Sequence, residues 1–183
     1  MAREVAVSRS AVDRAWPSFA AAGFALLLAR QAVAPSFLPF IYGWILVGAF
    51  VLARGSDDAG NVHPALVLVA GVSALFAARA ATGIGIPVRS GANAVFMNLL
   101  AAIAEEMFFR RYLYAKVARR GHALAIIVTA LLFALIHVPA YGTAAFPVDL
   151  GAGLLLSWQR WASGRWEMPA VTHATANLLV MMR

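Results

Sequence analysis

The sequence has no cysteine, and only 13% of its 183 residues are charged. Without thiols the chain has no disulfide framework, no thiolate metal site and no cysteine nucleophile. Soluble domains usually carry about a quarter charged residues, so this shortage of charge argues against a soluble protein. Long polar segments are missing as well. We therefore expect a single domain over residues 1–183, without a separate soluble module.

The sequence is instead rich in apolar residues, at 62%, and its mean hydropathy is +0.78. A helix that crosses a bilayer needs about 20 mostly apolar residues, and lipid tolerates no unpaired backbone polar groups. The sequence thus predicts an all-α, polytopic transmembrane helix bundle of about seven spans. The expected spans are Trp16–Ala34, Ser36–Ala53, His63–Ala81, Ala92–Tyr114, His122–Val138, Phe146–Ala162 and Met168–Met182.

The net charge of +7 raises the question of a nucleic-acid partner. The basic residues lie in short clusters between apolar runs, a pattern that the positive-inside rule explains, so we expect the lipid bilayer and no nucleic acid as partner. Eleven basic residues fall on one predicted side and three on the other, so we expect a protein of the cytoplasmic (inner) membrane with its N-terminus in the cytoplasm and its C-terminus on the far side. The eleven are Arg3, Arg9, Arg14, Arg54, Arg110, Arg111, Lys116, Arg119, Arg120, Arg160 and Arg165; the three are Arg79, Arg89 and Arg183, and Arg30 lies within the first span.

Two adjacent carboxylates, Glu105 and Glu106, lie inside the apolar fourth span. Charged residues at bilayer depth are costly and rare, and they face the protein interior, so they are functional candidates by default. On a helix Glu106 faces Arg110 one turn later, while Glu105 points about 100° away. We therefore expect Glu106 to be neutralised by Arg110 and Glu105 to have no local partner.

Two further pairs of residues, each with at least one polar side chain, lie within predicted spans. Phe133 and His137 are four residues apart in FALIH, and His173 and Asn177 are four apart in HATAN, so each pair shares a helix face. Any one of these polar residues alone could merely join neighbouring helices. At 1.5 Å per residue, Glu105, His137 and His173 lie about 21, 26 and 12 Å from the basic ends of their helices. Helix ends that project past the lipid could absorb that spread, so we expect these groups to converge around one water.

The residue types suggest hydrolytic chemistry at such a site. A desolvated Glu105 would gain proton affinity and could act as general base toward water. An imidazole could hold that water or pass a proton to a leaving amine, and Asn177 with the other imidazole could donate to an oxyanion. No serine or threonine accompanies these groups in a nucleophile motif, which favours water as the nucleophile.

The three motifs point to a known family. EEMFFR at Glu105–Arg110, FALIH at Phe133–His137 and HATAN at His173–Asn177 match EExxxR, FxxxH and HxxxN/B in order and spacing. In these motifs the chain resembles the CPBP family, the CAAX-processing and bacteriocin-processing intramembrane proteases. The resemblance covers about residues 92–182, the motif-bearing core.

The resemblance implies a glutamic membrane endopeptidase that acts on a membrane-anchored protein or peptide without a cofactor. It implies that Glu105 is the base, that His137 orients the water, and that His173 with Asn177 forms the oxyanion site. Glu106, Arg110 and Phe133 would support these groups. Removal of a C-terminal tail or sorting signal is the substrate class that we favour by analogy.

Three alternatives remain at this stage. A zinc-dependent protease could use the same carboxylate and imidazoles as ligands, although an HExxH motif is absent. Glutamate, arginine and histidine at depth also occur in proton or cation transport proteins. A non-catalytic immunity protein or scaffold could retain the same residues without activity.

Overall fold

The computed structural model describes residues 2–53, 60–82 and 91–181, with the backbone alone over residues 2–14. Within these ranges the regular elements are all helical. The longer helices are α1 (Ala2–Ala29), α2 (Leu38–Leu52), α3 (Pro64–Thr82), α4 (Ala92–Glu106), α6 (His122–Tyr141), α7 (Phe146–Ser163) and α8 (Glu167–Met181). The shorter elements are η1 (Arg30–Ala32), η2 (Pro35–Phe37), η3 (Met107–Leu113), α5 (Tyr114–Ala118) and η4 (Thr143–Ala145).

Each of the seven predicted spans corresponds to a helical segment, and most boundaries agree within a few residues. Helix α4 continues through η3 and α5 as one rod, and α1 begins well before the predicted first span. The boundaries follow the backbone chemistry of the turns. Gly164, for example, ends α7 with φ of 69° and donates its N–H to the carbonyl of Arg160, a left-handed helix cap that favours glycine.

The distribution of side chains is that of a membrane protein. Four described helical stretches, Pro35–Leu52, Pro64–Ala81, Ala92–Ala118 and His122–Tyr141, have the length and apolar composition to cross a bilayer. Large apolar side chains such as Phe40 and Leu66 are exposed on them, whereas Arg110 and Arg160 are almost fully buried. This arrangement suits a lipid environment and confirms an all-α polytopic bundle.

The burial of Arg110 and Arg160 corrects one step of the sequence analysis. Both were counted on the basic side of the membrane although they lie within predicted spans, and they are 0% and 1% exposed inside the bundle. They therefore form contacts inside the bundle and do not indicate which side of the membrane the loops face. Three other counted residues, Arg54, Arg89 and Arg183, lie outside the described residues, as does the predicted end of the last span at Met182.

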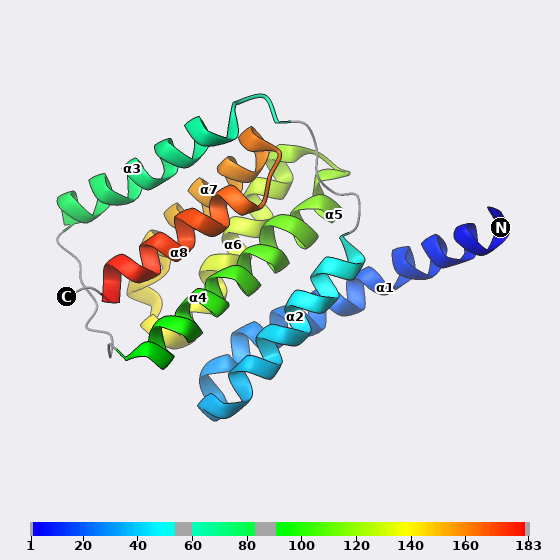
Figure 1. Ribbon diagram of the computed structural model, residues 1–183, viewed down its shortest axis with the longest axis horizontal. Helices are drawn as coiled ribbons and strands as arrows, with labels where there is room; N and C mark the ends of the chain where they lie inside the picture. The colour runs from blue at the N-terminus through cyan, green and yellow to red at the C-terminus, as the bar shows by residue number, and fades with distance from the viewer. Residues whose placement is uncertain (1, 54–59, 83–90, 182–183) are drawn as a thin grey trace.

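The helices form two flanks around a central group (Figure 1). Helix α2 packs on the α4–η3 rod and α1 packs on α2 and α6, whereas α3 packs against α7 and α8 on the opposite flank. The N-terminal turns of α1 extend away from the rest of the bundle (Figure 1). Helices α4, α6, α7 and α8 thus surround the position where α4 passes into η3, which is where the two glutamates lie.

The segment η3 is a π-helix, a wider turn than the α-helix on either side of it. Such turns are rare and often mark functional sites. Its main-chain carbonyl at Arg110 accepts a hydrogen bond from Nε of Arg160 at 3.0 Å, which ties η3 to α7. On the other side, Phe108 and Tyr112 pack around Phe19 of α1, with a Phe19–Tyr112 centroid distance of 4.8 Å. The wide turn is therefore fixed from both flanks.

Candidate active site

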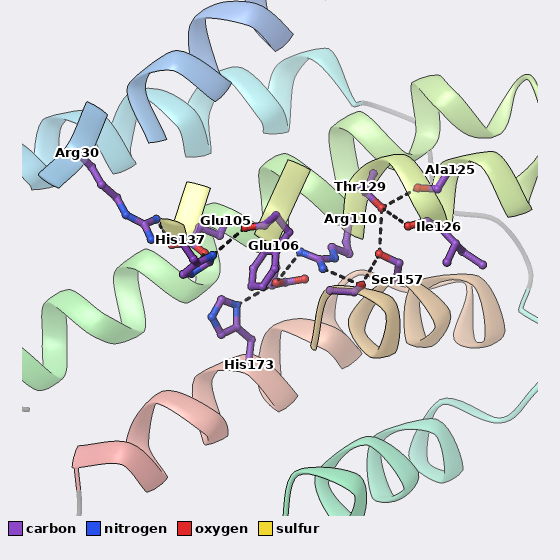
Figure 2. A network of polar contacts seen from close by, with 12 residues as sticks. Arg30, Glu105, Glu106, Arg110, Ala125, Ile126, Thr129, His137, Ser157 and His173 are labelled. Carbon is purple, nitrogen blue, oxygen red and sulfur yellow. Dashed lines mark hydrogen bonds and ion pairs between the residues drawn. The ribbon is translucent and has the colours of Figure 1, made fainter. Parts of the chain in front are cut away.

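The two glutamates end α4 and are buried from solvent and lipid. Glu105 is 2% exposed and Glu106 is 0% exposed. As successive residues of a helix they point in different directions, so each is contacted by different elements. Figure 2 shows Arg30 and His137 beside Glu105, and Arg110 and His173 beside Glu106. The site therefore consists of two adjoining ion-pair clusters.

Glu106 accepts two charge-assisted contacts at a single oxygen. Its Oε1 lies 3.1 Å from Nη1 of Arg110 and 2.9 Å from Nδ1 of His173. The expected pairing of Glu106 with Arg110 across one helical turn is therefore confirmed. Arg110 also donates from Nη2 to the carbonyl of Gly153 at 3.1 Å, so this guanidinium joins α4, η3 and α7.

Glu105 has a partner that helical spacing did not reveal. Nη1 of Arg30, in η1 at the end of α1, donates to Oε1 of Glu105 across 75 residues of sequence. Arg30 is only 7% exposed. The sequence signal was present, since a cation within an apolar span requires a buried counter-charge. Glu105 has no local partner, as expected, but it has a distant one.

His137 of α6 faces the other oxygen of Glu105. Its Nε2 lies 3.6 Å from Oε2 of Glu105, beyond hydrogen-bond distance, and none of the residues that the structure describes hydrogen-bonds this buried oxygen. Nδ1 of His137 lies 2.8 Å from the carbonyl oxygen of Phe133, which can only accept. Nδ1 therefore carries the proton, and in the neutral ring Nε2 is an acceptor.

Phe133 packs among the polar groups of both clusters. Its ring centroid lies 4.5 Å from that of His137 and 5.4 Å from that of His173, the latter edge to face. The guanidinium carbon of Arg110 lies 4.5 Å from the same ring centroid, a cation–π distance. The predicted sharing of one helix face by Phe133 and His137 is confirmed, and Phe133 separates the two imidazoles.

Asn177 lies one helical turn after His173 on α8 and is directed toward α4. Its Nδ2 donates to the carbonyl of Asn98 at 3.2 Å, and Asn98 precedes Glu105 by about two turns. The structure thus brings Glu105, Glu106, Arg110, Phe133, His137 and His173 together, and it places Asn177 at the adjoining α4–α8 contact.

A chain of neutral hydrogen bonds extends the site toward α6 and α7. Oγ1 of Thr129 lies 2.9 Å from Oγ of Ser157, and Ser157 donates to the carbonyl of Gly153 at 2.7 Å. That carbonyl also accepts from Arg110 (Figure 2). Thr129 and Ser157 belong to no motif that would mark them in the sequence, because isolated hydroxyl residues are common between membrane helices.

A metal site can be assessed for the described part of the chain. There, no group of three or more histidine, aspartate or glutamate side chains is arranged to hold an ion. The reason lies in the pairing: His137 faces Glu105, whereas Nδ1 of His173 binds Glu106. The carboxylates also accept from Arg30 and Arg110.

Together, the fold and the buried glutamate–histidine–arginine clusters define a polytopic membrane protein with a polar site enclosed by its helices. Residues 87–179 match the family described as Type II CAAX prenyl endopeptidase Rce1-like. The match covers about half of the chain and includes both glutamates, both site histidines and Asn177. The chain therefore belongs to this family, which confirms the predicted relationship to CAAX proteases. No curated protein and no solved structure matches the chain.

Proposed function

We propose that the protein is an intramembrane endopeptidase that hydrolyses a peptide bond through a water activated by Glu105. One observation carries this proposal: Oε2 of Glu105 is buried, receives no hydrogen bond from a described residue, and faces Nε2 of His137 at 3.6 Å. Membership of a CAAX endopeptidase family supports peptidase activity in general. The pairing of these two atoms supports water as the nucleophile.

The argument rests on two acceptors that face each other. A carboxylate oxygen has no proton, and Nε2 of neutral His137 has a lone pair, so the two atoms cannot hydrogen-bond directly. A water has two protons and can donate one to each atom. Located about 2.8 Å from both, it would form a triangle with the 3.6 Å separation. Its own lone pairs would then be free to attack a carbonyl carbon.

The reaction follows from that arrangement. The water oxygen bonds to the carbonyl carbon while one water proton passes to Glu105, which is general-base catalysis. The carbonyl oxygen becomes an oxyanion, and we assign His173 and Asn177 as its donors. Collapse of the tetrahedral intermediate breaks the C–N bond, and the amine leaves with the proton that Glu105 gives up. Each turnover consumes one water and regenerates Glu105.

The remaining motif residues hold these groups in place. Nδ1 of His173 is engaged by Glu106, so Nε2 is the nitrogen that can face a substrate, and it can donate to the oxyanion only when both ring nitrogens carry a proton. Arg110 fixes Glu106 from the other side, and Phe133 packs against both imidazoles. We therefore assign Glu106, Arg110 and Phe133 as supporting residues.

We propose a membrane-associated protein or peptide as substrate, cleaved close to its C-terminus so that a tail is removed. The family description refers to CAAX prenyl endopeptidases, which supports a prenylated tail as the first substrate to examine. We place the protein in the cytoplasmic membrane with its N-terminus in the cytoplasm. The basic clusters of the loops support this orientation.

Cleavage of an internally quenched peptide with a prenylated cysteine near its C-terminus tests the proposal. The purified protein in proteoliposomes should cleave it, and Glu105→Gln should lower kcat by about 10²–10⁴-fold, the usual contribution of a general base. Glu167→Gln is the matched control, because Glu167 lies exposed in the first turn of α8. Full activity of Glu105→Gln would reject the mechanism. Comparing the C-termini of membrane proteins with and without this protein would identify natural substrates.

Metal dependence is tested in the same assay. The glutamate–water mechanism predicts that a strong zinc chelator leaves cleavage unchanged. Activity that disappears with chelator and returns with added zinc would establish the metalloprotease alternative, with the same carboxylate and imidazoles as ligands.

A further inference from the structure

Arg30 is the feature of the site that lies outside the family match. It belongs to η1 at the end of α1, whereas the matched segment begins at residue 87. Its guanidinium is buried and donates to Oε1 of Glu105 (Figure 2). A buried cation is strongly unfavourable without a counter-charge, so this contact determines where the end of α1 lies.

The contact involves only one oxygen of the carboxylate. Arg30 engages Oε1, and the other oxygen, Oε2, remains directed at Nε2 of His137. A carboxylate rotates about its last side-chain bond, so a fixed donor on one oxygen determines where the other oxygen points. Arg30 therefore sets the orientation of the atom to which we assign base chemistry.

Among the residues that the structure describes, Arg30 is the cation that hydrogen-bonds Glu105. Arg110, the nearest alternative, is engaged by Glu106 and by the carbonyl of Gly153. Other titratable groups interact electrostatically with the Glu105–Arg30 pair and come from four further elements; they are Tyr42 of α2, His137 and Tyr141 of α6, Asp149 of α7 and His173 of α8. None of these supplies a permanent positive charge at Glu105.

We propose that Arg30 is a positioning residue for the hydrolytic reaction: it holds the carboxylate of Glu105 ionised and orients Oε2 toward His137. This inference rests on the proposed role of Glu105 as general base. It extends the working site from the family-matched segment to the first helix. Arg30 acts through Glu105, so its loss should lower the rate of the chemical step and leave substrate affinity unchanged.

Kinetics of Arg30→Met and Arg30→Lys test this inference. Methionine keeps much of the side-chain volume and removes the charge, and we expect kcat to fall by about 100-fold with KM unchanged, the cost of a misplaced catalytic group. Lysine can restore a single charged donor to Oε1 and should recover a large part of kcat. Arg79→Met is the matched control. Arg79 also joins two helices, since its Nη1 donates to the carbonyl of Leu179 at 3.1 Å, and its loss should leave kcat near the wild-type value.

A folding defect in Arg30→Met would be detected separately. The double variant Arg30→Met/Glu105→Gln removes both buried charges and should unfold closer to the wild type than Arg30→Met does. If Arg30→Met does not fold, the comparison of Arg30→Lys with the wild type decides: a lysine variant with less than about one-hundredth of wild-type kcat would overturn the inference.

Three results would overturn the inference in the assay itself. Wild-type or higher kcat in Arg30→Met would mean that Arg30 does not position the base. Arg30 would be a substrate-binding residue if Arg30→Met changes only KM, and does so for peptides with a free C-terminal carboxylate but not for amidated ones. If Arg30→Met is fully active while Glu105→Gln is inactive, the inference about Arg30 fails and the proposed function stands. If the wild-type protein cleaves no peptide, the inference and the proposed function both fail.

Discussion

The buried pair of Glu106 and Arg110 offers the sharpest test of the energetics of the site. Both side chains are 0% exposed, and Oε1 of Glu106 lies 3.1 Å from Nη1 of Arg110. Glu106→Gln leaves the guanidinium buried without its counter-charge, and Arg110→Met leaves the carboxylate with His173 alone. Removing one partner of a buried ion pair costs about 3–5 kcal/mol of the free energy of unfolding. We expect each single variant to lose stability in that range.

The double variant Glu106→Gln/Arg110→Met should lose much less than the sum of the two single losses. Both charges are then absent, and replacing a buried ion pair by uncharged groups is often close to neutral. The carbonyl of Gly153 loses the contact with Arg110 but keeps the hydrogen bond from Ser157 at 2.7 Å, so it is not left unsatisfied. Because the two single losses sum to about 6–10 kcal/mol, we expect a coupling energy of at least about 3 kcal/mol between the two positions.

Unfolding of the four proteins in mixed micelles, followed by circular dichroism, measures this coupling. Free energies of unfolding from the wild type, the two single variants and the double variant complete the cycle. Losses that add to within about 0.5 kcal/mol would show that the two positions act independently. That result would contradict the observed ion pair and the reasoning built on it.

Three further predictions follow from the site and the bundle. His173→Ala should lower kcat much more than it raises KM, because an oxyanion donor acts in the transition state; steady-state kinetics on the prenylated peptide measures this, and a change in KM alone would contradict it. Gly153→Ala should cost about 1–3 kcal/mol of unfolding free energy, because its new Cβ would lie 2.9 Å from Cα and O of Ala130. Gly43→Ala is the control and should be tolerated, because its Cβ would have no described atom within 4 Å. A reporter fused after Arg183 should be found outside the cytoplasm, and a cytoplasmic reporter would reject the orientation.

The fold could be predicted from the sequence because its signals are local. Apolar runs of span length end at Gly and Pro, and so the predicted and observed limits of the third helix, His63–Ala81 and Pro64–Thr82, differ by one residue. The extended start of α1 was missed, since residues 2–15 are polar enough to lie outside an apolar span yet are helical. The π-helical turn η3 was missed as well, because residue spacing does not distinguish it from an α-helix.

The candidate site could be predicted only as far as helical spacing reaches. The pairs Glu106–Arg110 and Phe133–His137 are four residues apart and were predicted correctly. The contact of Arg30 with Glu105 depends on how α1 crosses the bundle, which periodicity does not encode. The choice of Glu106 as the partner of His173 likewise depends on the position of α8 against α4.

The pairing pattern explains how two adjacent carboxylates can serve different purposes in one buried site. Two like charges so close together would repel each other, and one would be neutralised by protonation if neither had a counter-charge. Here Arg30 lies against Glu105 and Arg110 lies against Glu106, so the four groups balance. Each glutamate has one buried oxygen that no described residue hydrogen-bonds. Oε1 of Glu106 has a second donor, Nδ1 of His173, whereas the unbonded oxygen of Glu105 faces an imidazole nitrogen. Under the proposed mechanism, protonation of Glu105 leaves Arg30 without a counter-charge, and release of that proton to the departing amine restores the balance. The guanidinium from the first helix would thus keep Glu105 ionised before each cycle and favour release of the proton at its end, whereas it opposes the proton uptake between these two steps.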